Sequence, residues 1–167
     1  MWKIWILRIS LTLACLATFA WIFSNSLQTG EQSSSQSSSV VDTVQRVAAV
    51  FAPNSFIATA TGEAYERLHE QVRIVAHFCE FALLGALLVW CYRAYTDDKA
   101  FAFLPVALVL LTPIVDECLQ MATVGRSAEI FDVFVDSLGG ICGCIVAGIT
   151  LMIGFWIGKR RRKNGAG

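Results

Sequence analysis

Several ionisable residues of this sequence stand inside or beside long apolar stretches, at spacings that place them on shared helix faces. Arg73, His77 and Glu80 fall within about 60° of one another when each residue turns a helix by about 100°. Asp116 and Gln120 are four residues apart and therefore also share a face. Both spacings predict polar stripes on otherwise apolar helices.

A third stripe combines acids with small residues. Asp132 and Asp136 are four residues apart, and Gly139 and Gly143 continue the same face. Small residues at this spacing let two membrane helices approach closely. We therefore expect Gly139 and Gly143 to serve helix packing, and the whole stripe to point into a helix bundle.

These residues could carry acid–base or metal chemistry. An imidazole among carboxylates is a mixed nitrogen and oxygen ligand set, which could hold a divalent metal and activate water against a phosphate or ester. A histidine or glutamate could instead act as a general base. The candidate metal ligands are His77, Glu80, Asp116, Asp132 and Asp136, and Glu117 joins them as a catalytic candidate. The sequence contains no HExxH motif, so the catalytic residues, and a metal cofactor, stay open.

The acids outnumber the cations that could neutralise them. A charged side chain inside a bilayer costs about 2.5–3.5 kcal/mol even on the lenient insertion scale. Arg73, His77 and Arg126 are the available cations, so some acid must be protonated, hydrated or metal-bound. Arg126 could bind a phosphate or carboxylate ligand, or form a salt bridge with Glu129 or Asp132. The candidate ligand-binding residues are Arg73, His77, Glu80, Glu117, Gln120, Arg126, Asp132 and Asp136.

Four apolar segments must position these side chains. The chain is 56% hydrophobic and only 16% charged, whereas soluble domains carry about 25% charged residues. A membrane-spanning helix needs about 20 mostly apolar residues. The sequence therefore predicts an all-α membrane protein: one domain, residues 1–167, with a bundle of four transmembrane helices. Their expected ranges are 4–23, 72–95, 101–120 and 130–158.

The connection between the first two spans has two parts. Residues 24–60 are expected to form a serine-rich loop, in which residues 32–39 are low in complexity and predicted to be mobile. Apolar residues between Val40 and Phe51 recur at helical spacing. This pattern predicts a short amphipathic helix at the membrane interface.

The basic residues predict the orientation of the chain. The tail, residues 159–167, contains five consecutive Lys and Arg residues, and such segments stay in the cytoplasm. Four spans then place both termini in the cytoplasm, with nine of the 13 Lys and Arg residues on that side. We interpret the tail as a topology determinant rather than a nucleic-acid site. The polar stripes all fall at the opposite, extracytoplasmic side.

The ordered set of motifs resembles the VanZ-like family. The resemblance rests on Arg73-x-x-x-His77-Phe78-x-Glu80-Phe81-x-Leu83-Leu84-Gly85, Asp116-Glu117-x-x-Gln120, Gly125-Arg126, and Asp132-x-x-x-Asp136-x-x-Gly139-x-x-x-Gly143. The polar segment from Ser24 to Gln28 also resembles the end of that family's first helix. Val124 stands where the family often has proline. The resemblance implies a bacterial cytoplasmic (inner) membrane protein of the cell envelope, and the family is associated with resistance to teicoplanin, a glycopeptide antibiotic.

Three functions remain open from the sequence. The polar side could bind a lipid-linked envelope precursor or the lipid part of a glycopeptide, and so contribute to resistance. It could be an intramembrane hydrolase or transferase that acts on a lipid headgroup. The polar residues could also be structural, as buried pairs that fix how the helices meet. The expected partners are the bilayer and a lipid-like ligand, not nucleic acid, and the oligomeric state stays open.

Overall fold

A computed structural model describes residues 2–164, with side chains as far as Arg161. All regular elements of these residues are helices. They are α1 (Trp2–Ser26), α2 (Gly30–Phe51), α3 (Phe56–Thr59), α4 (Glu63–Tyr95), α5 (Leu104–Met121) and α6 (Ile130–Asn164). Four of them, α1, α4, α5 and α6, are long and apolar enough to cross a membrane. The predicted all-α membrane fold is therefore confirmed, and the chain is a multi-pass membrane protein.

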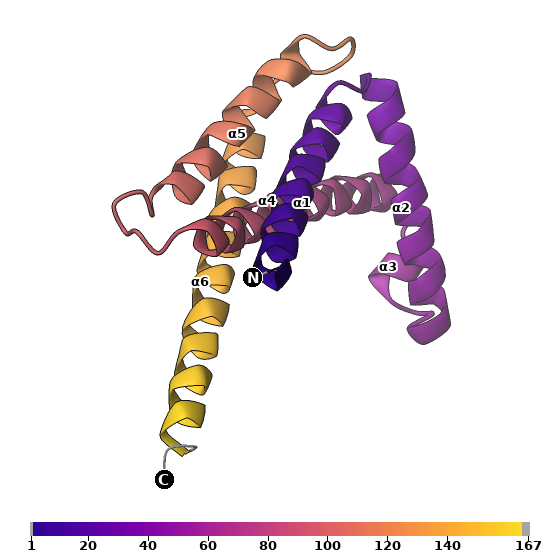
Figure 1. Ribbon diagram of the computed structural model, residues 1–167. Helices are drawn as coiled ribbons and strands as arrows, with labels where there is room; N and C mark the ends of the chain where they lie inside the picture. Colours follow the sequence, from indigo (N-terminus) through magenta and orange to yellow (C-terminus); the bar gives the residue numbers. More distant parts are fainter. Residues whose placement is uncertain (1, 165–167) are drawn as a thin grey trace.

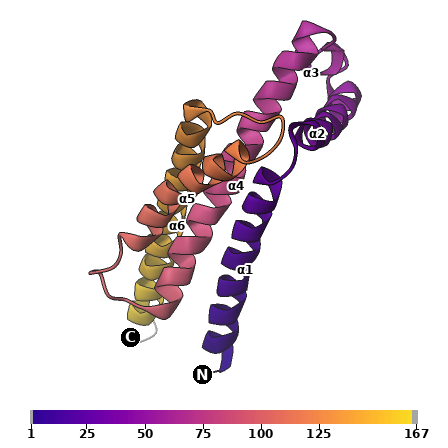
Figure 2. The same ribbon diagram turned by 90° about the horizontal axis from the view of Figure 1, so that it is seen from above.

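Helix α4 is the centre of the bundle. It contacts α1, α5 and α6, and its first turns also contact α2. The start of α1, the end of α6 and the connection from α4 to α5 lie at one end of the bundle (Figures 1 and 2). The other end, where α1 and α5 finish and α6 begins, is called the polar end below. Helix α4 continues past it, towards α3 (Figure 2).

Small residues bring α4 and α6 into close contact. A Cβ atom on Gly139 would collide with the backbone of Phe78, and one on Gly143 would collide with the backbone of Ala82. Only hydrogen fits at these positions, so the two helix backbones touch. This contact fixes the rotation of α6 against α4, and with it the direction in which Asp136, less than one turn before Gly139, projects.

Helix α2 corrects one expectation. The predicted serine-rich loop is wrong from Gly30 to Ser39, where the chain is helical. The helix predicted between Val40 and Phe51 is confirmed, as the second half of α2. A capping box starts the helix: Thr29 Oγ1 accepts from Gln32 N at 3.3 Å, and Gln32 Oε1 accepts from Thr29 N at 3.1 Å. Val41 is fully buried against Ala60 and Leu68. This tertiary packing stabilises a helix that the serine-rich composition alone disfavours.

Helix α2 covers the polar end. Figure 2 shows it nearly end-on while α1 and α4 run across the view, so α2 lies crosswise to the spans. Gly30 N donates to Val124 O at 3.1 Å in the connection between α5 and α6. Gly125 there has φ +76°, a conformation that favours glycine. This contact holds the first turn of α2 against the polar end.

Candidate functional site

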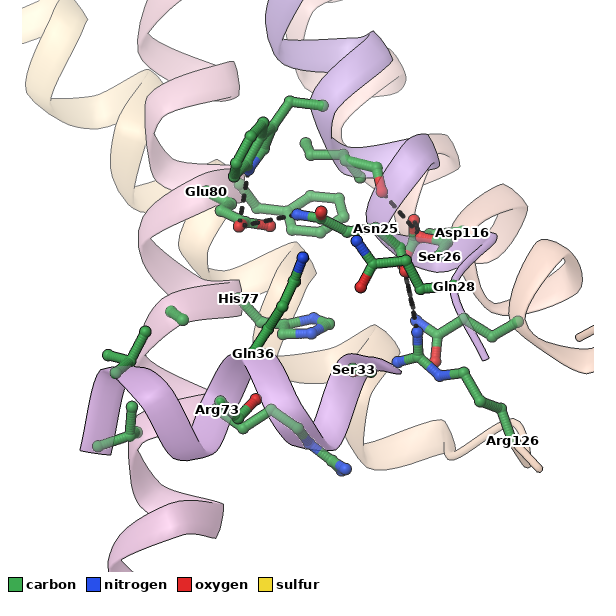
Figure 3. A pocket seen from close by; sticks show the side chains of 18 residues that line it. Asn25, Ser26, Gln28, Ser33, Gln36, Arg73, His77, Glu80, Asp116 and Arg126 are labelled. Atoms are coloured by element: carbon green, nitrogen blue, oxygen red, sulfur yellow. Dashed lines mark hydrogen bonds between the residues drawn. The ribbon is translucent and has the colours of Figure 1, made fainter. Parts of the chain in front are cut away.

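Two neighbouring cavities lie beneath α2 at the polar end. The first has a volume of about 180 Å³ and lies between α1, α2, α4 and α5 (Figure 3). The second, of about 170 Å³, lies between α2, α4 and the connection from α5 to α6. The residues that line both are Ser33, Ser37, Arg73, Gln120 and Arg126. The cavities therefore meet at two arginines and the serine face of α2.

Glu80 faces the first cavity and is held from α1. Its Oε1 accepts hydrogen bonds from Trp21 Nε1 at 3.0 Å and from Asn25 Nδ2 at 3.4 Å (Figure 3). Both donors lie in the last turns of α1, one turn apart. Glu80 therefore ties α1 to α4 and keeps its carboxylate at the cavity wall.

Asp116 forms the inner wall of the same cavity. Its side chain is almost fully buried, with 1% exposed. Ser26 Oγ donates to Oδ1 and Gln120 Nε2 donates to Oδ2 at 2.9 Å. Each carboxylate oxygen thus has a neutral donor, which fixes the orientation of the group without neutralising it.

His77 also lines the first cavity, and it contacts Asp136, which does not. His77 Nδ1 lies 3.4 Å from Asp136 Oδ1, and Asp136 is completely buried. Within residues 2–161, the two carboxylate oxygens of Asp136 have no hydrogen-bond partner, and His77 Nδ1 has none either. His77, Asp116 and Asp136 each place one possible metal-ligand atom within 4.8 Å of the others.

Two arginines separate the cavities. Arg73 Nη2 lies 3.5 Å from Asp132 Oδ2, so this pair closes one side of the second cavity. Arg126 is half-buried, and its Nη1 donates to the backbone oxygen of Asn25 at 3.2 Å. Burial lowers the pKa of Arg126, and the nearby charge of Arg73 lowers it further. Among the side chains to Arg161, neither Glu129 nor Asp132 forms an ion pair with Arg126.

Glu117 takes a different place from the other predicted residues. It is buried, yet it lines neither of the two cavities. Its Oε2 accepts from the backbone N of Glu129 at 2.9 Å, just before α6 begins. The structure thus separates Glu117 from its neighbour Asp116 and gives it a contact that anchors the α5–α6 connection.

Some lining residues were not among the predicted site residues. Trp21 and Asn25 come from α1, and Ser33, Gln36 and Ser37 come from α2. The sequence shows a polar end of α1 and predicts Glu80 as a site residue, but it does not show that the two are in contact. The serines were read as part of a loop, although Thr29-x-x-Gln32 is a helix-start signal that the sequence does contain.

A comparison with protein families decides the relationship of this chain. The family model described as VanZ/LLP1 matches residues 11–152. The chain belongs to the VanZ-like family. The comparison with curated proteins gave no match, and the comparison with solved structures gave none.

The VanZ-like match covers every site residue named above, from Trp21 to Asp136. It also covers the one visible departure from the family pattern, Val124 in place of proline. The turn is nevertheless tight here, because Gly125 has a positive φ and Val124 O accepts the hydrogen bond from Gly30. In this VanZ-like chain, Gly125 and the contact with α2 stabilise the turn between α5 and α6, where a proline would restrict the backbone.

Proposed function

We propose that the polar end binds the phosphate-bearing headgroup of a lipid-linked envelope precursor. One observation carries the proposal. Arg126 is half-buried between the two cavities, and the only hydrogen bond from its guanidinium to the described residues goes to a backbone oxygen. A guanidinium has five N–H donors, so most remain for a ligand.

The chemistry of the cavity walls favours an anionic ligand. Arginine matches the geometry of phosphate with two parallel hydrogen bonds. Arg73 lines the same space, and the hydroxyls of Ser33 and Ser37 add neutral donors from α2. Three of the four acidic residues that line the cavities already have partners: Glu80 with Trp21, Asp116 with Gln120, and Asp132 with Arg73. The fourth, Glu129, is exposed.

The size and the apolar lining favour a lipid. Pockets for whole drug-sized molecules measure about 300–1,000 Å³, whereas the first cavity has about 180 Å³. This volume suits a headgroup whose chains stay in the bilayer. Trp21, Val40 and Val72 supply an apolar part of the wall, and tryptophan is common where membrane proteins meet the headgroup region.

The charge pattern supports an outward-facing site in the bacterial cytoplasmic membrane. Nine of the 13 Lys and Arg residues fall at the end opposite the polar end, which the positive-inside rule assigns to the cytoplasm. Both termini are then cytoplasmic, and the cavities open at the outer leaflet. Lipid-linked precursors of the envelope are consumed on this side.

A cellular role follows from the ligand. Glycopeptides act on lipid-linked precursors outside the membrane, and the VanZ-like family is associated with teicoplanin resistance. A protein that holds the precursor headgroup changes how accessible the precursor is to such an antibiotic. We therefore propose a contribution to resistance against teicoplanin-type glycopeptides.

The test compares two ligands that differ only in the headgroup. Full-length protein in lipid nanodiscs is titrated with a polyprenyl diphosphate and with the uncharged polyprenol of equal chain length. Preferential binding of the diphosphate supports the proposal, and equal binding contradicts it. Analysis of the recovered lipid separates binding from catalysis, since a hydrolase or transferase would convert the diphosphate.

A further inference from the structure

We infer that His77, Asp116 and Asp136 hold a divalent transition-metal ion. Asp136 carries the inference, because it is 0% exposed and neither of its oxygens accepts a hydrogen bond from residues 2–161. Leaving a buried carboxylate without hydrogen bonds costs much free energy. His77 Nδ1 is also without a hydrogen bond and lies beside it.

The spacing of the three groups fits one ion. Two ligand atoms on a tetrahedral zinc, each at about 2.0–2.1 Å, are separated by about 3.4 Å. His77 Nδ1 and Asp136 Oδ1 lie 3.4 Å apart. Asp116 completes the set, with all three ligand atoms within 4.8 Å of one another.

The surroundings orient these ligands. Ser26 and Gln120 donate to the two oxygens of Asp116, as the hydrogen-bonded neighbours of metal-binding carboxylates do. His77, Asp116 and Asp136 come from α4, α5 and α6, one from each helix. The glycine contacts between α4 and α6 set the distance from His77 to Asp136. The ion would therefore join three spans.

The arrangement leaves one coordination position open. His77 and Asp116 line the first cavity, whereas Asp136 does not. An ion among them faces the cavity on the side without protein ligands, where water or an oxygen of a bound ligand completes the coordination. Imidazole favours zinc and its neighbours over magnesium and calcium, and carboxylates also suit manganese. The structure assigns this site to Zn²⁺ or Mn²⁺.

This inference does not rest on lipid binding, and its test contains no polyprenyl ligand. Full-length protein in detergent is treated with EDTA, dialysed, and titrated with ZnCl₂ and MnCl₂. The expected result is saturable binding of one ion per chain. Mg²⁺ and Ca²⁺ in excess should not displace it. Absence of saturable Zn²⁺ and Mn²⁺ binding overturns the inference.

Two variants and a matched control locate the ion. Loss of a group that only orients a metal ligand costs about 10–100-fold in affinity, so Asp136→Asn and His77→Gln should each weaken binding at least tenfold. Glu117→Gln changes an equally buried carboxylate on the neighbouring face of α5 and should bind as the wild type does. Wild-type affinity in both site variants overturns the inference.

The melting temperature supplies a second readout that separates an ion site from a structural pair. In the metal-free protein, Asp136→Asn removes a buried carboxylate that accepts no hydrogen bond from residues 2–161, and should raise the melting temperature. After metal is added, the wild type should gain stability with concentration and the variant should not. If His77 and Asp136 are only a structural pair, the variant melts below the wild type with and without metal, and the inference fails.

Discussion

Arg126→Gln is the substitution that most directly tests headgroup binding. Arg126 lies outside the spans, in the connection between α5 and α6, and lines both cavities. Its one hydrogen bond to the described residues runs to the oxygen of Asn25. Glutamine has a shorter side chain and no charge, so the variant removes the donors that a phosphate would use.

The magnitude follows from the number of bonds lost. A hydrogen bond to a charged group contributes about 1.5–3 kcal/mol, and every 1.4 kcal/mol changes a dissociation constant about tenfold. Arginine can donate two such bonds to a phosphate. The loss in the variant is smaller than two full bonds, because Arg73 remains beside the ligand and the hydrogen bond from Arg126 to Asn25 no longer has to be kept. We therefore expect a net loss of about 2–3 kcal/mol, which raises Kd for the diphosphate about 30–150-fold.

The assay is titration of nanodisc-embedded protein, with the neutral polyprenol measured in parallel. Arg126→Gln should lose affinity for the diphosphate and leave polyprenol binding unchanged. Arg67→Gln is the matched control, since Arg67 is exposed on α4 and pairs with Glu63 away from both cavities. The reasoning is refuted if Arg126→Gln binds the diphosphate as the wild type does, or if Arg67→Gln loses as much.

Three further outcomes are expected. Gly143→Leu forces α4 and α6 apart and should cost about 1–3 kcal/mol of stability, measured by thermal unfolding. The control Gly154→Leu places its side chain in open space and should not lower the stability. Equal melting temperatures of the two variants would disprove the close contact. Thr29→Ala removes the capping box and should weaken α2 by about 1 kcal/mol, seen as faster amide exchange in its first turns; unchanged exchange would contradict this. A single cysteine in place of the exposed Gln36 should react with an impermeant maleimide in intact cells. If this cysteine reacts only after the cells are lysed, the predicted orientation of the chain in the membrane is wrong.

The sequence by itself determined the local part of this protein. The length and composition of the apolar segments predicted four spans, since a helix must be long and apolar enough to cross a bilayer. Helical periodicity placed Arg73, His77 and Glu80 on one stripe, and Asp132 with Asp136 on another. These relations lie within single helices, so neighbouring residues decide them.

The tertiary structure decided which stripes meet and how. Asp116 and Glu117 are adjacent, so they point about 100° apart on the helix, and only Asp116 lines the first cavity. Which of them does so depends on how α5 is rotated against α4 and α6. That rotation is set by packing between helices distant in the sequence, such as Gly139 against Phe78. Composition alone favours neither choice.

The same reason explains α2. Its serines have little tendency to form a helix alone, and only the part from Val40 to Phe51 was predicted to be helical. The burial of Val41 against Leu68 and the contact of Gly30 with the turn at Val124 supply stability from outside the segment. The sequence thus determined that His77, Asp116 and Asp136 could share a site. Only the packing of α4, α5 and α6, under α2, selected these three and left Asp136 buried beside His77.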